Sequence, residues 1–251
     1  MFQIIASLLL VTSLINAENG PPKEAIHATK PYLISETHPI KTQLDAFFHR
    51  ERFTFCEKSL KEAGFTHYRP RDFTRLIVAK HPRFPGYVFK MYLDVQQYYK
   101  SKPEWKQWVL RVRGAKLIGR EIEKQGWQHL FKVPQKWIYR LPPVPKPEKG
   151  YLPKYYILVE EDMDLLSDAN NKAVWKSDKI TPELLTKLHH LIDELGLLDC
   201  AKIDNVPFSH DGRIAFIDTQ TFHAHSIAWE SLNDYLNSKN RKCWVELTEQ
   251  D

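Results

Sequence analysis

The sequence has few cysteines and none in the paired spacing of a metal site. Its 251 residues include three, Cys56, Cys200 and Cys243, an odd number without a Cys-x-x-Cys pair. This pattern argues against a zinc site built from cysteines. For an exported protein two arrangements stay open, one disulfide with one free thiol or three small buried side chains, and we favour the second.

Long hydrophobic runs are absent after the opening stretch, "MFQIIASLLLVTSLINAENG". This stretch predicts a signal peptide, residues 1–17, cleaved after Ala17. It has no Lys or Arg before its apolar core, so a short N-terminal anchor and a buried helix remain alternatives. The run is short for a membrane-spanning helix, and we expect no stable membrane span after the leader is removed. The predicted location is secreted or periplasmic.

A dense basic stripe is also missing. The 36 Lys and Arg residues exceed the 31 Asp and Glu residues only slightly, and the formal charge of +5 is spread along the chain. Nucleic acid is therefore not an expected partner, and an anionic ligand is supported only weakly. With 43% hydrophobic residues the chain has enough apolar side chains for one substantial domain or two small lobes.

The predicted elements follow the order of an α+β protein. Residues 18–38 are polar and proline-bearing, which favours a linker or arm over the surface. The helix at 181–198 has Thr181 as its N-cap and Pro182 at its first position. Apolar spacing predicts further helices at 40–53, 56–64, 102–127 and 225–247, and strands at 74–82, 86–94, 131–142 and 155–166.

The stretch "DNVPFSHDGRIAFIDTQ", residues 204–220, predicts a hairpin with Asp211-Gly212 at its turn. A hairpin returns its ends to one place, so Asn205 and Asp218 should lie side by side. An amide oxygen and a carboxylate at one point suit a hard divalent cation such as Mg²⁺. The alternative for Asn205 is that its side chain caps a turn.

Lys90 lies inside the apolar strand "YVFKMYL". A long cation is costly there unless its amine reaches water along the strand surface or meets an anion. The first alternative is a lysine that extends to solvent. The second is a pair with a carboxylate on the helix at 102–127, Glu121 first and Glu123 second, next to the phosphates of a nucleotide.

These residues resemble the protein kinase-like fold over residues 60–222. Lys90 in "VFKMY" is similar to the family's phosphate-binding lysine, and Glu121 in "GREIE" to its helix glutamate. The stretch "YYILVEEDM" resembles the hinge between the two lobes, and "DCAKIDNVPF" resembles the catalytic loop. Asp218 in "AFIDTQ" resembles the metal-binding aspartate.

The sequence also departs from the family pattern. Five positions before Asn205, where the family has its catalytic aspartate, stands Cys200, with Asp199 one step earlier. Asp199 serves as base if the loop holds an extra residue. Alternatively Asp204 is the metal ligand, or phosphoryl transfer is lost. Leu197 and Thr219-Gln220 replace further motif residues, and no glycine-rich loop is present.

The resemblance implies a kinase-like α+β fold, with a small antiparallel-sheet lobe at 39–160 and a reduced helical lobe at 161–251. One implied function is Mg-ATP-dependent phosphoryl transfer to a hydroxyl group. Asp199 would then orient the acceptor, Lys90 and Glu121 would hold the nucleotide phosphates, and Asn205 and Asp218 would hold Mg²⁺. The alternative is a catalytically inactive pseudokinase, or a secreted module that binds a protein partner.

Overall fold

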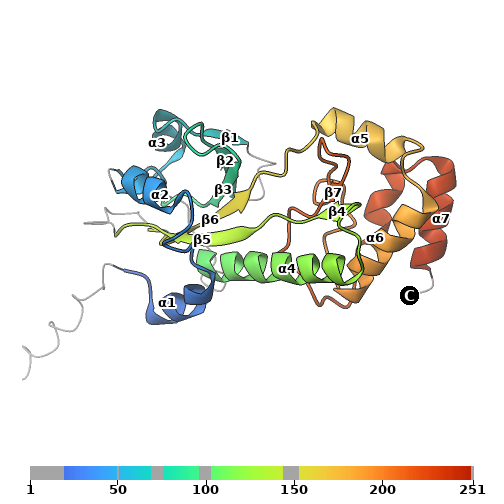
Figure 1. The fold of residues 1–251 in the computed structure, drawn as a ribbon, viewed down its shortest axis with the longest axis horizontal. Coiled ribbons are helices and arrows are strands. Elements are labelled where there is room, and N and C mark those ends of the chain that lie inside the picture. Colours follow the sequence, from blue (N-terminus) through green and yellow to red (C-terminus); the bar gives the residue numbers. More distant parts are fainter. Residues whose placement is uncertain (1–19, 50, 69–75, 96–102, 144–152, 250–251) are drawn as a thin grey trace, which may run out of the picture.

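The fold is a mixed α+β structure with one antiparallel sheet, as the sequence predicts (Figure 1). The computed structural model describes residues 20–49, 51–68, 76–95, 103–143 and 153–249, so the predicted signal peptide lies outside the described residues. The strands are β1 Thr66–Tyr68, β2 Ile77–Lys80, β3 Tyr87–Met91, β4 Phe131–Lys132, β5 Lys136–Arg140, β6 Tyr156–Glu161 and β7 Ile214–Ala215. The helices are α1 Lys23–Thr29, η1 Lys30–Tyr32, α2 Lys41–Phe48, α3 Glu57–Glu62, α4 Glu104–Lys124, α5 Asp168–Lys176, α6 Pro182–Glu194, η2 Trp229–Tyr235 and α7 Ser238–Thr248.

The main sheet has the strand order β1-β2-β3-β6-β5, and each neighbouring pair is antiparallel. Strands β2 and β3 lie within the segments predicted as strands at 74–82 and 86–94, and they pair as an antiparallel hairpin with Val78 opposite Lys90. After β3 the chain leaves the sheet through α4 and returns to β5 and β6. Strand β6 lies between β3 and β5, so the residues that it presents on one face have neighbours from both strands.

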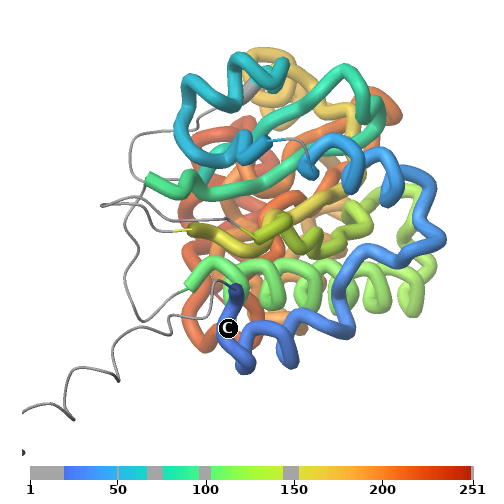
Figure 2. Tube along the Cα trace, turned by 90° about the vertical axis from the view of Figure 1, so that its left-hand side faces the viewer, coloured from blue at the N-terminus to red at the C-terminus, as the bar shows by residue number. Residues whose placement is uncertain are grey.

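The sheet is covered on both faces. Helices α2 and α3 lie over one face, and α4 with α1 lies over the other (Figure 2). Strand β6 supplies side chains to the cores on both faces. Ile157 and Val159 belong to the core beneath α2 and α3, whereas Tyr156 and Leu158 belong to the core beneath α4. Successive side chains of a strand point to opposite faces. Residues of even number on β6 therefore face α4.

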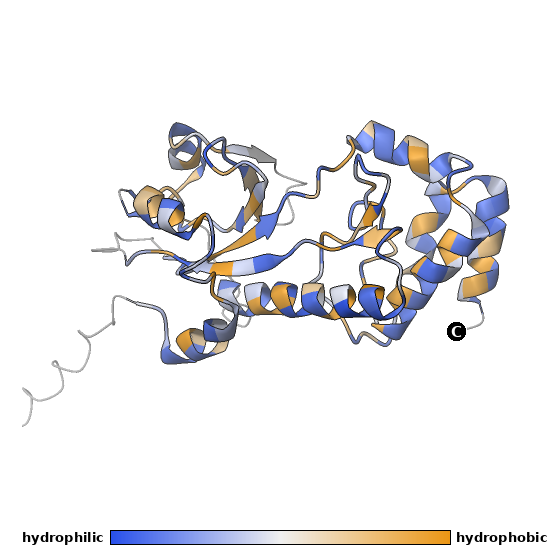
Figure 3. Cartoon of the chain, viewed as in Figure 1, coloured by the Kyte–Doolittle hydropathy of each residue, from blue (hydrophilic) through white to orange (hydrophobic). Residues whose placement is uncertain are grey.

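A third hydrophobic cluster forms the core of the C-terminal part (Figure 1). It is built mainly from α6 and residues 195–216, with single buried residues from α5, η2 and α7, and it also includes Ile118 and Ile122 from the second half of α4. The first half of α4 packs on the sheet through residues such as Trp108. Figure 3 shows apolar residues recurring between polar ones along α4 and α6. Helix α4 thus joins the two halves of the molecule.

The helix predicted at 181–198 begins as expected. Thr181 Oγ1 accepts a hydrogen bond from the backbone N–H of Leu184 at 3.2 Å, and Pro182 occupies the first turn. The helices predicted at 40–53, 56–64 and 102–127 are α2, α3 and α4, and the closing segment is the helix pair η2 and α7. These predictions are confirmed. The apolar residues of each helix recur regularly over a short stretch of sequence, so local spacing was enough to find the helices.

Residues 20–38, the described part of the linker or arm predicted at 18–38, form an arm that packs on the rest of the protein. This segment contains α1 and η1, and Ala25 of α1 is fully buried. Beyond η1, the backbone N–H of Ile34 donates to the carbonyl of Ile138 at 2.9 Å. The segment therefore covers the outer edge of β5. Its signal in the sequence was weak because α1 buries only Ala25 and Thr29, one turn apart.

The cysteines form no disulfide. All three lie within the described residues and are free thiols, of which Cys200 is buried and Cys56 and Cys243 are partly exposed. In the described part of the chain, no helix is both long enough and apolar enough to cross a membrane.

Candidate functional site

The predicted hairpin at 204–220 is present. Phe208 and Ile214 form an antiparallel bridge, and Gly212 has a positive φ of 84° at the turn. At the open end, the backbone N–H of Ile217 donates to the carbonyl of Asn205 at 3.1 Å. This bond and the Phe208–Ile214 bridge place Asn205 opposite Ile217 and Asp204 opposite Asp218. Asn205 and Asp218 are therefore close along the hairpin mouth but one position out of register, and the predicted side-by-side placement is not what the hairpin gives.

Three charged side chains gather on the sheet face that α4 covers. Glu160 of β6 lies directly opposite Lys136 of β5, and Lys90 of β3 lies opposite Leu158, two residues from Glu160. These positions share one face because of the two-residue period of a strand. Glu160 forms ion pairs with both lysines, at 2.9 Å from Lys90 Nζ and 3.0 Å from Lys136 Nζ.

Both lysines also bind the hairpin. Lys90 Nζ and Lys136 Nζ donate to the same carbonyl oxygen, that of Ile217, at 3.0 Å and 2.8 Å. The Lys90 side chain is only 7% exposed, so its amine does not extend to solvent. The structure thus brings Lys90 next to Asp218, the residue that follows Ile217. The first alternative for Lys90, a lysine reaching bulk water, is excluded.

Asp218 is held by a helix residue that the sequence did not point to. Arg111 of α4 donates from its guanidinium to the Asp218 carboxylate. Arg111 is buried, whereas the Asp218 side chain is 35% exposed. The same stretch is fixed to α4 a second time, because Thr219 Oγ1 donates to the carbonyl of Arg111 at 2.6 Å.

The cluster holds more positive than negative groups. Lys90, Lys136 and Arg111 face two carboxylates, Glu160 and Asp218. Complete burial lowers the pKa of Lys136 from its ordinary 10.5 to about 8, although the charge of Glu160 acts in the opposite direction. Burial alone would raise the pKa values of Glu160 and Asp218. The nearby cations outweigh it and lower both pKa values, so both carboxylates stay ionised at neutral pH.

The predicted pair of Lys90 with Glu121 is wrong, and Glu123 does not replace it. Lys90 pairs with Glu160, while Glu121 binds Lys124 and Gln125 of its own helix. Glu123 is exposed. Glu121 lies too far along α4 to reach Lys90. Arg111, which meets Asp218, stands ten residues before Glu121, and ten residues span about 15 Å of helix.

Asp199 and Cys200 lie on the other side of the hairpin mouth. The Asp199 carboxylate is 2.5 Å from Lys202 Nζ, and its carbonyl accepts from the Asn205 side-chain amide at 2.9 Å. Cys200 donates through Sγ to the carbonyl of Asp218 at 3.6 Å, and burial raises the pKa of its thiol. The residue in register with the family's catalytic aspartate is therefore an inert buried thiol.

The predicted cation site does not fit a divalent metal in this arrangement. The carboxylate of Asp218 already accepts from the Arg111 guanidinium. Asn205 stands opposite Ile217 and not opposite Asp218 in the hairpin. Lys90 and Lys136 add two further positive charges one residue away. Across the described ranges no group of three or more His, Cys, Asp or Glu residues is placed to hold a metal ion.

Lys136, Glu160 and Arg111 were not identified from the sequence. Lys136 and Glu160 carried the same signal that marked Lys90, a charge next to or within an apolar strand. Pairing them required the register of β5 on β6, which joins residues 24 positions apart. Arg111 had no such signal, because arginines are common on long helices.

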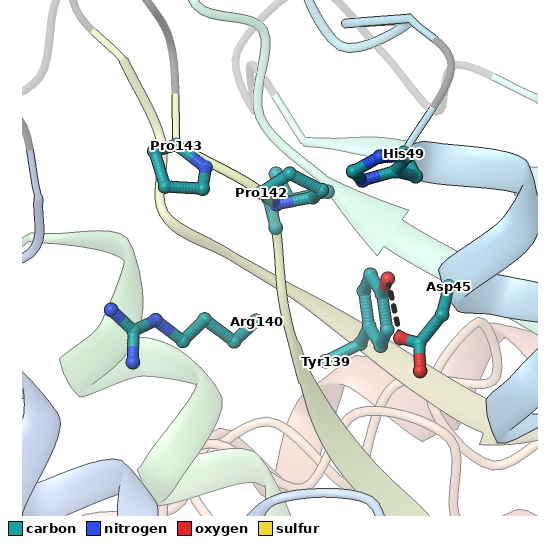
Figure 4. Close-up of a pocket in the computed structure, with 7 residues that line it drawn as sticks. Asp45, His49, Tyr139, Arg140, Pro142 and Pro143 are labelled. Atoms are coloured by element: carbon teal, nitrogen blue, oxygen red, sulfur yellow. Dashed lines mark hydrogen bonds between the residues drawn. The ribbon is translucent and has the colours of Figure 1, made fainter.

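A pocket of about 280 Å³ lies elsewhere, at the end of β5 (Figure 4). Tyr139 points into it and donates to the carboxylate of Asp45 at 3.0 Å, and that carboxylate also binds Lys41. None of the predicted site residues lines this pocket. Its lining residues are Asp45, His49, Tyr139, Arg140, Leu141, Pro142 and Pro143.

The comparisons add no relative to this picture. Neither a scan against protein-family models nor a search of curated proteins finds a match to the chain. The clues to function are therefore the residues of the charged cluster around Lys90 and Asp218.

Proposed function

We propose that the chain is an exported kinase-like protein that acts by binding another protein, without transferring phosphoryl groups. The proposal of a kinase-like protein rests on the order in which the lysine strand, the helix and the two polar residues follow one another along the chain. In protein kinases the phosphate-binding lysine stands on the third strand and a helix follows, while an asparagine and an aspartate farther along hold the metal. Here Lys90 stands on β3, α4 follows, and Lys90 contacts the end of the hairpin that carries Asn205 and Asp218 through the carbonyl of Ile217.

The proposal that the protein does not transfer phosphoryl groups rests on the contacts that the Lys90 amine already makes. Two of its three N–H donors are used, one by Glu160 and one by the Ile217 carbonyl, and the side chain is almost fully buried. One donor is left for a phosphate, and a phosphate could reach it only by approaching an amine that is almost fully buried. Lys90 is therefore a structural link between the sheet and the hairpin.

The residues that would contact a substrate hydroxyl support the same proposal. Asp199 would have to accept a hydrogen bond from a substrate hydroxyl, but its carboxylate is paired with Lys202. The residue in register with the catalytic aspartate is Cys200, whose thiol is buried. Neither residue presents a free general base at the hairpin mouth.

Phosphoryl transfer to a hydroxyl with Mg²⁺ and ATP remains the second candidate. It is favoured by one observation, the partial exposure of the Asp218 side chain next to Asn205. Arg111 would have to release Asp218 before a metal could bind there.

A transfer assay separates the two functions. The full chain is incubated with ATP labelled at the terminal phosphate, with Mg²⁺ and an unstructured acceptor rich in serine and tyrosine. We expect wild-type protein to label itself and the acceptor no more than the Lys90→Met variant does. Labelling that Lys90→Met and Asp199→Asn both abolish would establish the second candidate.

A further inference from the structure

Arg111 stands where a metal-dependent site would need its cation. Its guanidinium donates to Oδ1 of Asp218, the residue expected to bind Mg²⁺. An arginine side chain keeps its positive charge at any pH at which proteins remain folded. Because a buried charge needs a counter-charge, Arg111 and Asp218 neutralise each other without any ion from solution.

The surroundings of Arg111 hold it in this place. The Arg111 carbonyl accepts from Thr219, the residue after Asp218, so α4 and the hairpin end are joined through both backbone and side chain. Gly114, one turn later, permits this approach, since a Cβ there would lie 1.9 Å from the Thr219 carbonyl oxygen. The contact is built by the fold and is not a chance meeting of surface side chains.

The neighbouring charges also oppose a divalent ion. Lys90 and Lys136 both contact the carbonyl that immediately precedes Asp218. An ion bound to the Asp218 carboxylate would stand close to the guanidinium and both ammonium groups. Like charges repel, and of these three cations only the guanidinium is bound to the Asp218 carboxylate itself. The second carboxylate of the cluster, Glu160, is already shared by the two lysines.

We infer that Arg111 is an internal cation that replaces the divalent metal at Asp218, so the hairpin mouth is assembled without metal. This inference rests on the proposed non-catalytic function and gives the residue responsible for it. Removing the charge of Arg111 should open a cation site at the Asp218 carboxylate. Such a site provides the oxygen ligands that Mg²⁺ and Mn²⁺ prefer.

The test uses Mn²⁺ alone as the probe, without nucleotide. Binding to the full chain is followed by electron paramagnetic resonance of free Mn²⁺. We expect no specific binding to wild-type protein. Arg111→Gln and Arg111→Met, which remove the charge and keep much of the side-chain length, should bind one Mn²⁺ at least roughly tenfold more tightly than wild type. Adding Asp218→Asn to either variant should abolish the gain.

Two results would overturn the inference: wild-type protein that binds one Mn²⁺ and loses it on Asp218→Asn, or folded Arg111 variants that bind no better than wild type. If neither variant folds, as judged by circular dichroism, the wild-type titration with its Asp218→Asn control decides alone. The proposed function fails by a different measurement, transfer of labelled phosphate. Wild-type protein that binds Mn²⁺ but transfers no phosphate would refute only the inference. Transfer that survives Asp218→Asn would refute only the proposed function.

Discussion

Gly114 of α4 lies directly against the backbone carbonyl of Thr219. A methyl group at position 114 would come within 1.9 Å of that oxygen, a distance at which one of the two segments must move. The glycine lowers the helix propensity of α4, and in return it lets the helix touch the hairpin end that carries Asp218.

The first prediction follows from this contact. Gly114→Ala should destabilise the protein by about 2–3 kcal/mol, because overpacking forces α4 and the hairpin end apart. Gly119→Ala on the same helix is the matched control, since its Cβ would lie 3.3 Å from a Val133 methyl group. This control should be neutral or slightly stabilising. Urea unfolding of both variants gives the comparison, and equal effects would contradict the prediction.

The second prediction concerns the partner of Lys90. Glu160→Gln should cost about 3 kcal/mol, because it leaves two buried lysines without their shared counter-charge. In a double-mutant cycle, Lys90→Met should couple strongly to Glu160→Gln and not at all to Glu121→Gln. The free energies of unfolding of the single and double variants decide this. Coupling to Glu121 would restore the pairing predicted from the sequence.

The difference between these two glutamates shows what the sequence could and could not predict. Lys90 was identified because an isolated charge in an apolar strand needs a partner. Its partner Glu160 comes from another strand, and strand register depends on contacts far apart in sequence. Glu121 was predicted because a lysine in an apolar strand needs a carboxylate and the following helix offers one. Neither that argument nor the family resemblance fixes the position of α4 along the sheet.

The hairpin shows the opposite case. Asp211-Gly212 between two short apolar runs is a local signal, and it sufficed to predict the hairpin, although the register puts Asn205 opposite Ile217 and not opposite Asp218. Local rules did not reveal that Arg111 would meet Asp218, since 107 positions separate them. They also missed α1, whose two buried residues are too few to give a helical pattern.

The third prediction is a pH dependence caused by Lys136. Its pKa is about 8 in the folded protein, below the ordinary 10.5 expected on unfolding. Between these values the unfolded chain binds more protons, so the contribution of Lys136 to the free energy of unfolding rises with pH. Chemical unfolding of wild type and Lys136→Met at intervals across this range should show a steeper rise for wild type. Parallel curves would contradict the assignment.

The fourth prediction concerns the N-terminus. If residues 1–17 are a signal peptide, protein recovered after export should begin at Glu18. Intact mass measurement of the exported protein gives this directly. An exported protein that keeps its first residue would favour the N-terminal anchor instead.

The binding of Mg-ATP tests the central claim, that Lys90 is used by Glu160 and Ile217 and is not presented to phosphate. Thermal unfolding of the full chain is measured with and without millimolar Mg-ATP, with Lys90→Met as the control. A ligand at a hundred times its dissociation constant would add about 2.7 kcal/mol to the free energy of unfolding. We predict no change in the unfolding midpoint of wild-type protein. A rise in that midpoint that disappears in Lys90→Met would contradict the claim.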